Sequence, residues 1–224
     1  VAGLLTFFIE KHKKEEFLVH LLAGFLSFMT FGFLIFFVYK TRCEPVCDQM
    51  QLVLDAIFFK HGNYEDMLGY MRTFQQQYGL VFLEEIMMYI KEDYRILQYL
   101  NAFFAAGCVY AMYRVSDILF QNPAISLLTL FFTVTFVPVY FYTNFVYGEM
   151  PSLFFAMYAT FFLLQFLEKS GEGIQFVNKK NWYLLTGTIL FFTLAYISRT
   201  NLIILLIATA LSLAVYAIRN RKYQ

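Results

Sequence analysis

The stretch LVHLLAGFLSFMTFGFLIFFVY, Leu18–Tyr39, contains no Asp, Glu, Lys or Arg. A hydrocarbon core about 30 Å thick is crossed by roughly 20 consecutive apolar residues in a helix, so this stretch predicts a membrane-spanning helix. Lys11, Lys13 and Lys14 precede it, and basic residues stay preferentially on the cytoplasmic side. We therefore expect a retained signal anchor that runs from the cytoplasm outward.

Further apolar runs follow, and with the composition they predict the fold class. Of the 224 residues, 60% are hydrophobic and only 15% are charged, which exceeds what a soluble globule needs. The predicted fold is all-α: a polytopic transmembrane helical bundle that forms a single transmembrane domain over residues 1–224. Spans are expected near residues 18–39, 96–113, 125–143, 151–167, 182–198 and 202–218.

The basic residues of the short connections give an independent indication of orientation. Counting the spans from a cytoplasmic N-terminus places every basic short connection inside, as the positive-inside rule requires. This pattern predicts a multi-pass protein of the plasma membrane with its N-terminus in the cytoplasm. The residues concerned are Arg114, Lys169, Lys179, Lys180, Arg219, Arg221 and Lys222.

The one long loop, residues 40–95, is predicted to lie outside the cytoplasm. It carries more acidic than basic residues, as an exported loop can. Two groups of apolar residues in it recur at helical spacing and predict two amphipathic helices on the membrane surface, separated by His61-Gly62-Asn63. The groups are Met50, Val53, Leu54, Ile57 and Phe58, then Phe82, Leu83, Ile86 and Ile90.

Several functional classes find no support in the sequence. A formal net charge of +1 lacks the basicity of a nucleic-acid-binding protein, so no nucleic-acid partner is expected. Neither a phosphate-binding glycine loop nor a nucleophile elbow is present. Cys43 and Cys47 lack the second pair that would indicate a zinc site, and Cys108 lies in an apolar run.

Three polar places fall on the predicted outer face, where ionisable residues near span ends mark candidate functional sites. Asp48 opens the first surface helix and is either a functional carboxylate or a helix N-cap. Glu149, beside Pro151, either orients a ligand or stabilises a helix N-terminus through the helix dipole. Arg199 lies between two apolar spans and either binds phosphate or anchors the helix at the interface.

The motifs around these residues resemble those of the GT-C superfamily of polytopic glycosyltransferases, in particular bacterial relatives of the protein O-mannosyltransferase family. The similarity covers nearly the whole chain, which corresponds to the amino-terminal catalytic portion of a longer enzyme. The segments that carry it are Pro45-Val46-Cys47-Asp48-Gln49, Gly62-Asn63-Tyr64, Gln77-Tyr78-Gly79-Leu80, Tyr147-Gly148-Glu149-Met150-Pro151 and Arg199-Thr200-Asn201.

The resemblance implies inverting transfer of a sugar from a polyprenyl-phosphate donor at the extracytoplasmic face. Asp48 would be the general base, Arg199 would bind the donor phosphate, and Glu149 would position the sugar or a divalent cation. It implies a glycan, lipid or protein acceptor and membrane lipid as a partner. Because the donor is already activated, no nucleotide need bind this chain; the resemblance implies no certain cofactor, and a divalent cation stays an open alternative. Reserve candidates for the site are Asp55, Gln77, Tyr147 and Asn201.

Two other functional classes remain as alternatives. A multi-pass transporter or lipid flippase would place ionisable or helix-breaking residues near the bilayer midplane, and here only Pro138 interrupts a span. A non-catalytic membrane scaffold would use the acidic loop as a docking surface. The nearly uncharged span centres favour chemistry at the surface over passage through the membrane.

Overall fold

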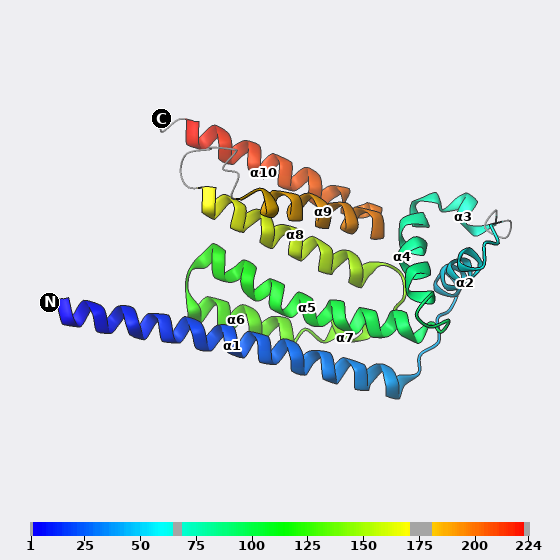
Figure 1. The fold of residues 1–224 in the computed structure, drawn as a ribbon, viewed down its shortest axis with the longest axis horizontal. Helices are drawn as coiled ribbons and strands as arrows, with labels where there is room; N and C mark the ends of the chain where they lie inside the picture. Colours follow the sequence, from blue (N-terminus) through cyan, green and yellow to red (C-terminus); the bar gives the residue numbers. More distant parts are fainter. Residues whose placement is uncertain (1, 65–68, 171–180, 222–224) are drawn as a thin grey trace.

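The computed structural model describes residues 2–64, 69–170 and 181–221, and within these ranges all regular elements are helical. Figure 1 shows the longer helices side by side, with both chain ends on the same side of the bundle. They are α1 (Ala2–Thr41), α5 (Arg95–Phe120), α6 (Pro123–Val134), α8 (Glu149–Ser170), α9 (Trp182–Ser198) and α10 (Ile203–Arg221). The predicted all-α class is therefore confirmed for the described residues.

Within the described ranges, three helices are long and apolar enough to cross a membrane, namely Phe17–Thr41, Arg95–Phe120 and Glu149–Lys169. Shorter apolar helices occupy Pro123–Val134, Trp182–Ser198 and Thr200–Val215. These helices lie where the apolar runs of the sequence predicted spans. Many large apolar side chains of α1 are exposed on the bundle surface, including Phe25 and Phe28, as expected of a helix that contacts lipid.

The run predicted as one span over residues 125–143 is divided into two helices. Helix α6 ends at Val134, and α7 (Val137–Tyr142) begins after a short break. Pro138 lies in the first turn of α7, where a missing N–H is tolerated. In a continuous helix its ring would clash with the carbonyl of Val134. The break therefore follows from Pro138.

Helix α5 lies at the centre of the bundle and packs against α1, α6 and α8. Its small side chains Ala102 and Ala105 are fully buried, next to the Phe154 and Phe155 rings of α8. At Gly107, an added Cβ would lie 2.3 Å from the ring of Phe154. Small residues on α5 thus let the aromatic face of α8 approach its backbone.

Buried amides at the start of α5 fix the loops at the bundle end. Gln98 donates to the carbonyls of Cys43 at 2.8 Å and Asn144 at 3.0 Å. Asn101 donates to the carbonyls of Thr143 and Phe145 at 3.3 and 3.1 Å. The loop after α1 and the loop before α8 are therefore attached to the same helix, since a buried amide N–H is costly to leave without an acceptor.

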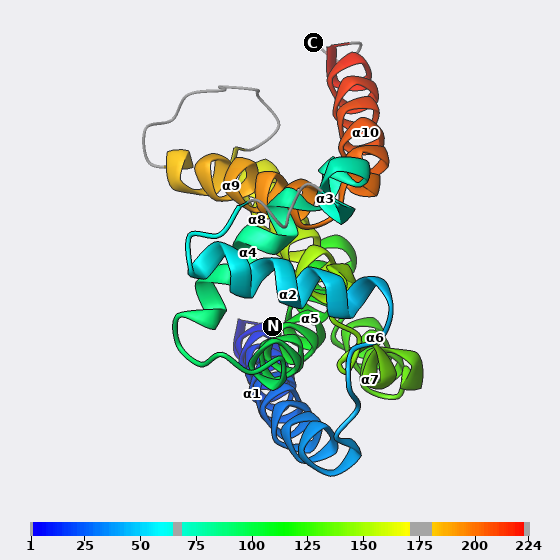
Figure 2. The same ribbon diagram turned by 90° about the vertical axis from the view of Figure 1, so that its right-hand side faces the viewer.

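Three helices of the long loop cap this end of the bundle, and we refer to them as the surface layer. They are α2 (Asp48–Lys60), α3 (Tyr70–Thr73) and α4 (Tyr78–Met88), with a single 3₁₀ turn at Gln75–Gln77. Figure 2, which views this end directly, shows α2 and α4 lying across the bundle. A buried cluster joins the surface layer to the bundle end; it is formed by Leu52, Val53, Ala56, Met71, Leu80, Val81 and Met88 of the layer, with Leu97 of α5 and Val146 before α8.

Candidate functional site

The ends of α8 and α9 bring Glu149 and Arg199 into direct contact. Glu149 is the first residue of α8, and Arg199 directly follows the last residue of α9. The Nη1 atom of Arg199 lies 2.8 Å from Oε1 of Glu149, and both side chains are partly buried, with exposures of 27% and 24%. Two residues that are 50 positions apart in the sequence therefore form one charged pair at the bundle end.

Tyr147 completes this contact. The Nη1 atom of Arg199 also donates to the Tyr147 carbonyl at 3.0 Å, and the guanidinium lies 5.1 Å from the centre of the Tyr147 ring. Stacking on an aromatic face and a hydrogen bond to a carbonyl both hold an Arg side chain in one orientation. The described contacts use Nη1, which leaves the Nε and Nη2 edge of the fork for another ligand.

Gly148 explains how the two helix ends meet. Its φ angle is +86°, and an added Cβ would lie 2.5 Å from the carbonyl oxygen of Ser198. A side chain is thus disfavoured by the backbone conformation and by the contact. Gly79 has a similar role between α4 and α9, because an added Cβ would lie 2.5 Å from the carbonyl oxygen of Ile197.

A cavity of about 570 Å³ opens beside the charged pair, and we call it the rim cavity. Glu149, Arg199 and Asn201 supply its charged and amide groups, and the rest of its wall is mainly apolar. An apolar cleft with a few convergent polar groups is the usual form of a ligand site. The apolar residues come chiefly from α7 and α8 and include Pro138, Val139, Met150, Leu153, Ala156 and Met157.

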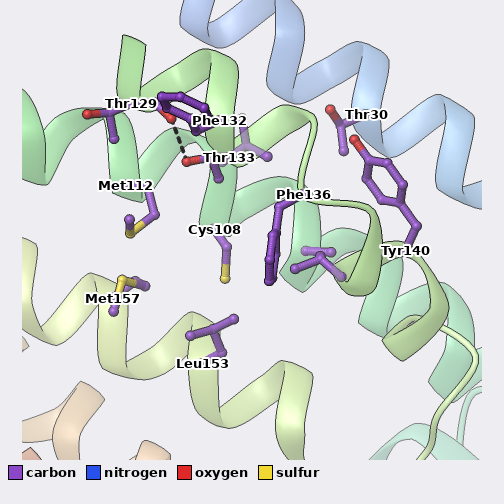
Figure 3. Close-up of a pocket in the computed structure, with 13 residues that line it drawn as sticks. Thr30, Cys108, Met112, Thr129, Phe132, Thr133, Phe136, Tyr140, Leu153 and Met157 are labelled. Atoms are coloured by element: carbon purple, nitrogen blue, oxygen red, sulfur yellow. Dashed lines mark hydrogen bonds between the residues drawn. The ribbon is translucent and has the colours of Figure 1, made fainter. Parts of the chain in front are cut away.

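A second cavity of about 530 Å³, the mid-bundle cavity, lies among α1, α5, α6, α7 and α8. Figure 3 shows Thr30, Cys108 and Met157 around it. The two cavities share wall residues, so they lie next to each other. No charged side chain of the described residues lines the mid-bundle cavity. The shared residues are Phe136, Val139, Leu153 and Met157.

Asp48 lies on the surface layer, exposed at the start of α2. The N-cap position belongs to Cys47, with φ of 51°, so Asp48 is in the first turn and is not the cap. A carboxylate there is stabilised by the helix dipole. Asp48 does not line the rim cavity. Tyr70, also on the surface layer, contacts Tyr147. The Tyr70 hydroxyl oxygen lies 3.4 Å from that of Tyr147.

The surroundings of Tyr70 also affect the ionisation of its phenol. Burial, the hydrogen bond and charge of Tyr147, and the charge and hydrogen bond of Asp48 all raise the pKa of the Tyr70 phenol. The structure therefore brings two of the three places selected from the sequence, Glu149 and Arg199, into direct contact, and the contact between Tyr70 and Tyr147 joins this end of the bundle to the surface layer. Tyr70 itself was not identified from the sequence, since no motif includes it.

Two reserve candidates lie away from the rim cavity. Asp55 is a residue of α2 and is fully buried, and Gln77 is buried in the 3₁₀ turn before α4. Asp55 accepts a hydrogen bond from Gln51 at 2.9 Å. Glu84 of α4 is buried near Asp55, and burial, followed by the charge of Asp55, raises the pKa of the Glu84 carboxyl. Among the described residues, neither carboxyl oxygen of Glu84 has a hydrogen-bond partner.

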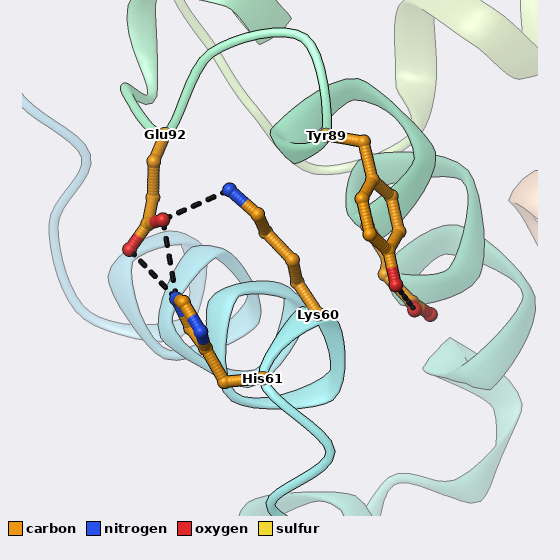
Figure 4. A network of polar contacts seen from close by, with 5 residues as sticks. Lys60, His61, Tyr89 and Glu92 are labelled. Atoms are coloured by element: carbon orange, nitrogen blue, oxygen red, sulfur yellow. Dashed lines mark hydrogen bonds and ion pairs between the residues drawn. The ribbon is translucent and has the colours of Figure 1, made fainter.

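An exposed ionic network ties the two long helices of the surface layer together. Glu92, after α4, contacts Lys60 at 2.9 Å and His61 at 3.2 Å, as Figure 4 shows. The hydrogen bond from Lys60, followed by that from His61, lowers the pKa of the Glu92 carboxyl. Exposed pairs of this kind contribute little to stability, so the buried cluster does most to hold the layer together.

Within the described ranges, no group of three or more His, Cys, Asp or Glu side chains is arranged to hold a metal ion. Glu149 is the acidic residue that reaches the rim cavity. Comparison of the chain with protein-family models, curated proteins and solved structures found no match. The resemblance to the GT-C superfamily therefore stays a prediction that rests on the short motifs.

Proposed function

We propose that this chain is the membrane-embedded catalytic portion of a glycosyltransferase. It transfers a sugar from a polyprenyl-phosphate donor to an acceptor hydroxyl at the extracytoplasmic face of the plasma membrane. The observation that carries this proposal is the Arg199–Glu149 pair at the mouth of a cavity whose remaining wall is mainly apolar. Such a site suits a ligand with an anionic head and a hydrocarbon tail.

Arg199 binds the donor phosphate in this proposal. Its Nε and Nη2 edge offers two parallel N–H donors, which match two phosphate oxygens. Its Nη1 stays on Glu149 and Tyr147, so the guanidinium is already oriented before the donor binds. As the bond between the sugar and the phosphate breaks, charge develops on the departing oxygen, and a preorganised cation stabilises that charge.

The apolar cavities accommodate the hydrocarbon part of the donor. The rim cavity adjoins the mid-bundle cavity, which reaches Thr30 in α1 and Cys108 in α5. A polyprenyl tail placed there buries apolar surface, at about 25 cal/mol per Å² removed from water. Each additional isoprene unit that fits therefore adds to the affinity for the donor, while the phosphate stays at the rim.

Asp48 acts as the general base. It takes the proton from the acceptor hydroxyl, whose oxygen forms a bond to the anomeric carbon as the bond from that carbon to the phosphate oxygen breaks. The products are the glycosylated acceptor, with inverted configuration, and polyprenyl phosphate. Asp48 is exposed at the outer edge of the surface layer, where an acceptor glycan, lipid or protein can approach. Glu149 positions a hydroxyl of the donor sugar.

A lipid flippase is the second candidate, because the mid-bundle cavity extends away from the rim. Moving a phosphate head group through it would require cationic or strongly polar partners at depth. The described wall of that cavity holds hydroxyls and sulfur but no charge. This favours a cavity that holds a tail over one that conducts a head group.

The experiment that tests the proposal uses the purified protein with a panel of polyprenyl-phosphate sugars and measures release of free polyprenyl phosphate. General-base assistance is worth about 10² to 10⁴ in rate, so Asp48→Asn should lose transfer by that factor while folding normally. The control is Glu44→Gln, which removes another exposed carboxylate just before α2. Ordinary transfer by Asp48→Asn would remove Asp48 from the mechanism, and lipid translocation without release would favour the flippase.

A further inference from the structure

A row of aromatic rings leads from Arg199 to Tyr142, and both of these residues line the rim cavity. The Arg199 guanidinium lies 5.1 Å from the centre of the Tyr147 ring. The centre of the Phe145 ring lies 6.0 Å from that of Tyr147 and 5.8 Å from that of Tyr142. The contacts between these rings are T-shaped, an arrangement that aromatic pairs prefer. The row therefore fixes the position of Tyr142 relative to the guanidinium.

Tyr142 presents a ring face and a hydroxyl that a ligand in the rim cavity can contact. It is the last residue of α7, and its side chain is 45% exposed. Its ring meets that of Phe145 at an interplanar angle of 78°, so this contact covers at most one of its two faces. Within the described ranges, no hydrogen bond involves its hydroxyl.

The wall of the rim cavity supplies both kinds of contact that a sugar requires. The hydroxyls of a pyranose need donors and acceptors, which the Glu149 carboxylate and the Asn201 amide offer. The C–H groups on the face of the sugar ring are weakly positive, and the electron-rich face of an aromatic ring attracts them. Of the two aromatic residues in the described wall, Phe136 also lines the mid-bundle cavity, whereas Tyr142 does not.

We propose that the Tyr142 ring is the platform on which the donor sugar packs, and that Tyr142 is therefore a specificity-determining residue. One face of the sugar lies on the ring, its hydroxyls bond to Glu149 and Asn201, and the phosphate stays on Arg199. This inference rests on the proposed function and assigns the sugar-binding part of the same site. Tyr142 takes no part in proton transfer or in breaking the bond between sugar and phosphate.

The test measures binding and does not depend on transfer. It compares two lipids of the same chain length: polyprenyl phosphate, and the member of a panel of polyprenyl-phosphate hexoses that binds most tightly. Tyr142→Ala should raise the Kd of the sugar-bearing lipid about tenfold, or about 1.4 kcal/mol, which is the upper range for an aromatic contact. The Kd of polyprenyl phosphate should not change. Tyr142→Phe, which keeps the ring, should retain most of the preference for the sugar-bearing lipid.

A second variant separates loss of the platform from loss of the fold. Tyr142→Leu keeps an apolar side chain but has no aromatic face, so it should lose the same preference as Tyr142→Ala. The matched control is Phe141→Ala. Phe141 is the preceding residue of α7 and is 65% exposed, but its ring lies 6.1 Å from that of Phe37 in α1, and it does not line the rim cavity. This control should leave both Kd values unchanged.

The possible results distinguish this inference from the proposed function. If Tyr142→Ala and Tyr142→Leu kept the preference for the sugar-bearing lipid, or weakened both lipids equally, Tyr142 would be an interfacial anchor. The inference would then fail while the proposed function stands. A loss as large in Phe141→Ala would overturn the inference in the same way. If the wild-type protein bound neither lipid, the proposed function would fail, and this inference with it.

Discussion

The bundle end and the surface layer each contain buried polar atoms without a partner among the described residues, but they differ in how their acids are paired. At the bundle end, the amide N–H groups of Gln98 and Asn101 donate to backbone carbonyls, and Arg199 is paired with Glu149. In the surface layer, Glu84 is buried with no hydrogen-bond partner for its carboxyl oxygens among the described residues. The first region is built to hold charges in place, whereas the second stores an electrostatic cost beneath the helix that carries Asp48.

The largest effect is expected at the bundle end. Arg199→Ala should lower kcat about 10²- to 10³-fold, the loss typical of removing one preorganised donor at developing charge. Arg199→Lys should recover only part of this, because lysine keeps the charge but lacks the planar fork. Release of polyprenyl phosphate with saturating donor is the measurement. The control is Arg72→Ala, an exposed arginine of α3, and equal losses in both variants would argue against a specific role for Arg199.

A pair of glycine variants compares the two regions directly. Gly148 and Gly62 both have positive φ angles, +86° and +71°, but an added Cβ meets the Ser198 carbonyl only at Gly148. Gly62→Ala should cost about 1 to 2 kcal/mol of stability for the backbone conformation alone. Gly148→Ala should cost more and should also lower transfer, because the turn that carries Glu149 must move away from α9. Thermal unfolding in detergent measures both variants, and equal losses would contradict the close contact.

Much of the bundle could be predicted from the sequence, because lipid is a solvent that requires long apolar runs. The helices containing Leu18–Tyr39 and 151–167 lie where those runs were found. The division of 125–143 was not predicted, although Pro138 is the residue that explains it. A proline alone does not reveal whether neighbouring helices will support a kink or a break.

The candidate site was predictable only in part. Asp48, Glu149 and Arg199 stand out as polar residues at apolar boundaries, but the contact between Glu149 and Arg199 depends on how closely the Gly148 turn approaches α9, which no local pattern marks. Glu84 had a weak signal: it occupies the position of an apolar residue in the buried series of α4, which also contains Leu80 and Met88. Whether such an acid is buried depends on the elements that pack against it, and the spacing of residues within one helix does not identify those elements.

The smallest and most local effect that we expect is the change in the pH dependence of stability on substitution of Glu84. Burial and the charge of Asp55 raise the pKa of Glu84 above its ordinary value of 4.5. The folded state therefore binds a proton that the unfolded state releases, and stability falls as pH rises from about 4.5 toward the folded-state pKa, by up to about 1.4 kcal/mol per pH unit. Glu84→Gln removes this titration, so its advantage over wild type should grow with pH across that window and be absent below it.

Thermal unfolding at pH 4.5 and pH 8 is the measurement. The control is Glu85→Gln, the next and less buried carboxyl of α4, which should keep the pH dependence of the wild type. If Glu84→Gln were equally stable relative to wild type at both pH values, Glu84 would not carry the stored cost, and the contrast between the two regions would fail. If Glu84→Gln were more stable than wild type but transferred less sugar, we would conclude that the buried Glu84 keeps the surface layer mobile enough for Asp48 to reach its acceptor.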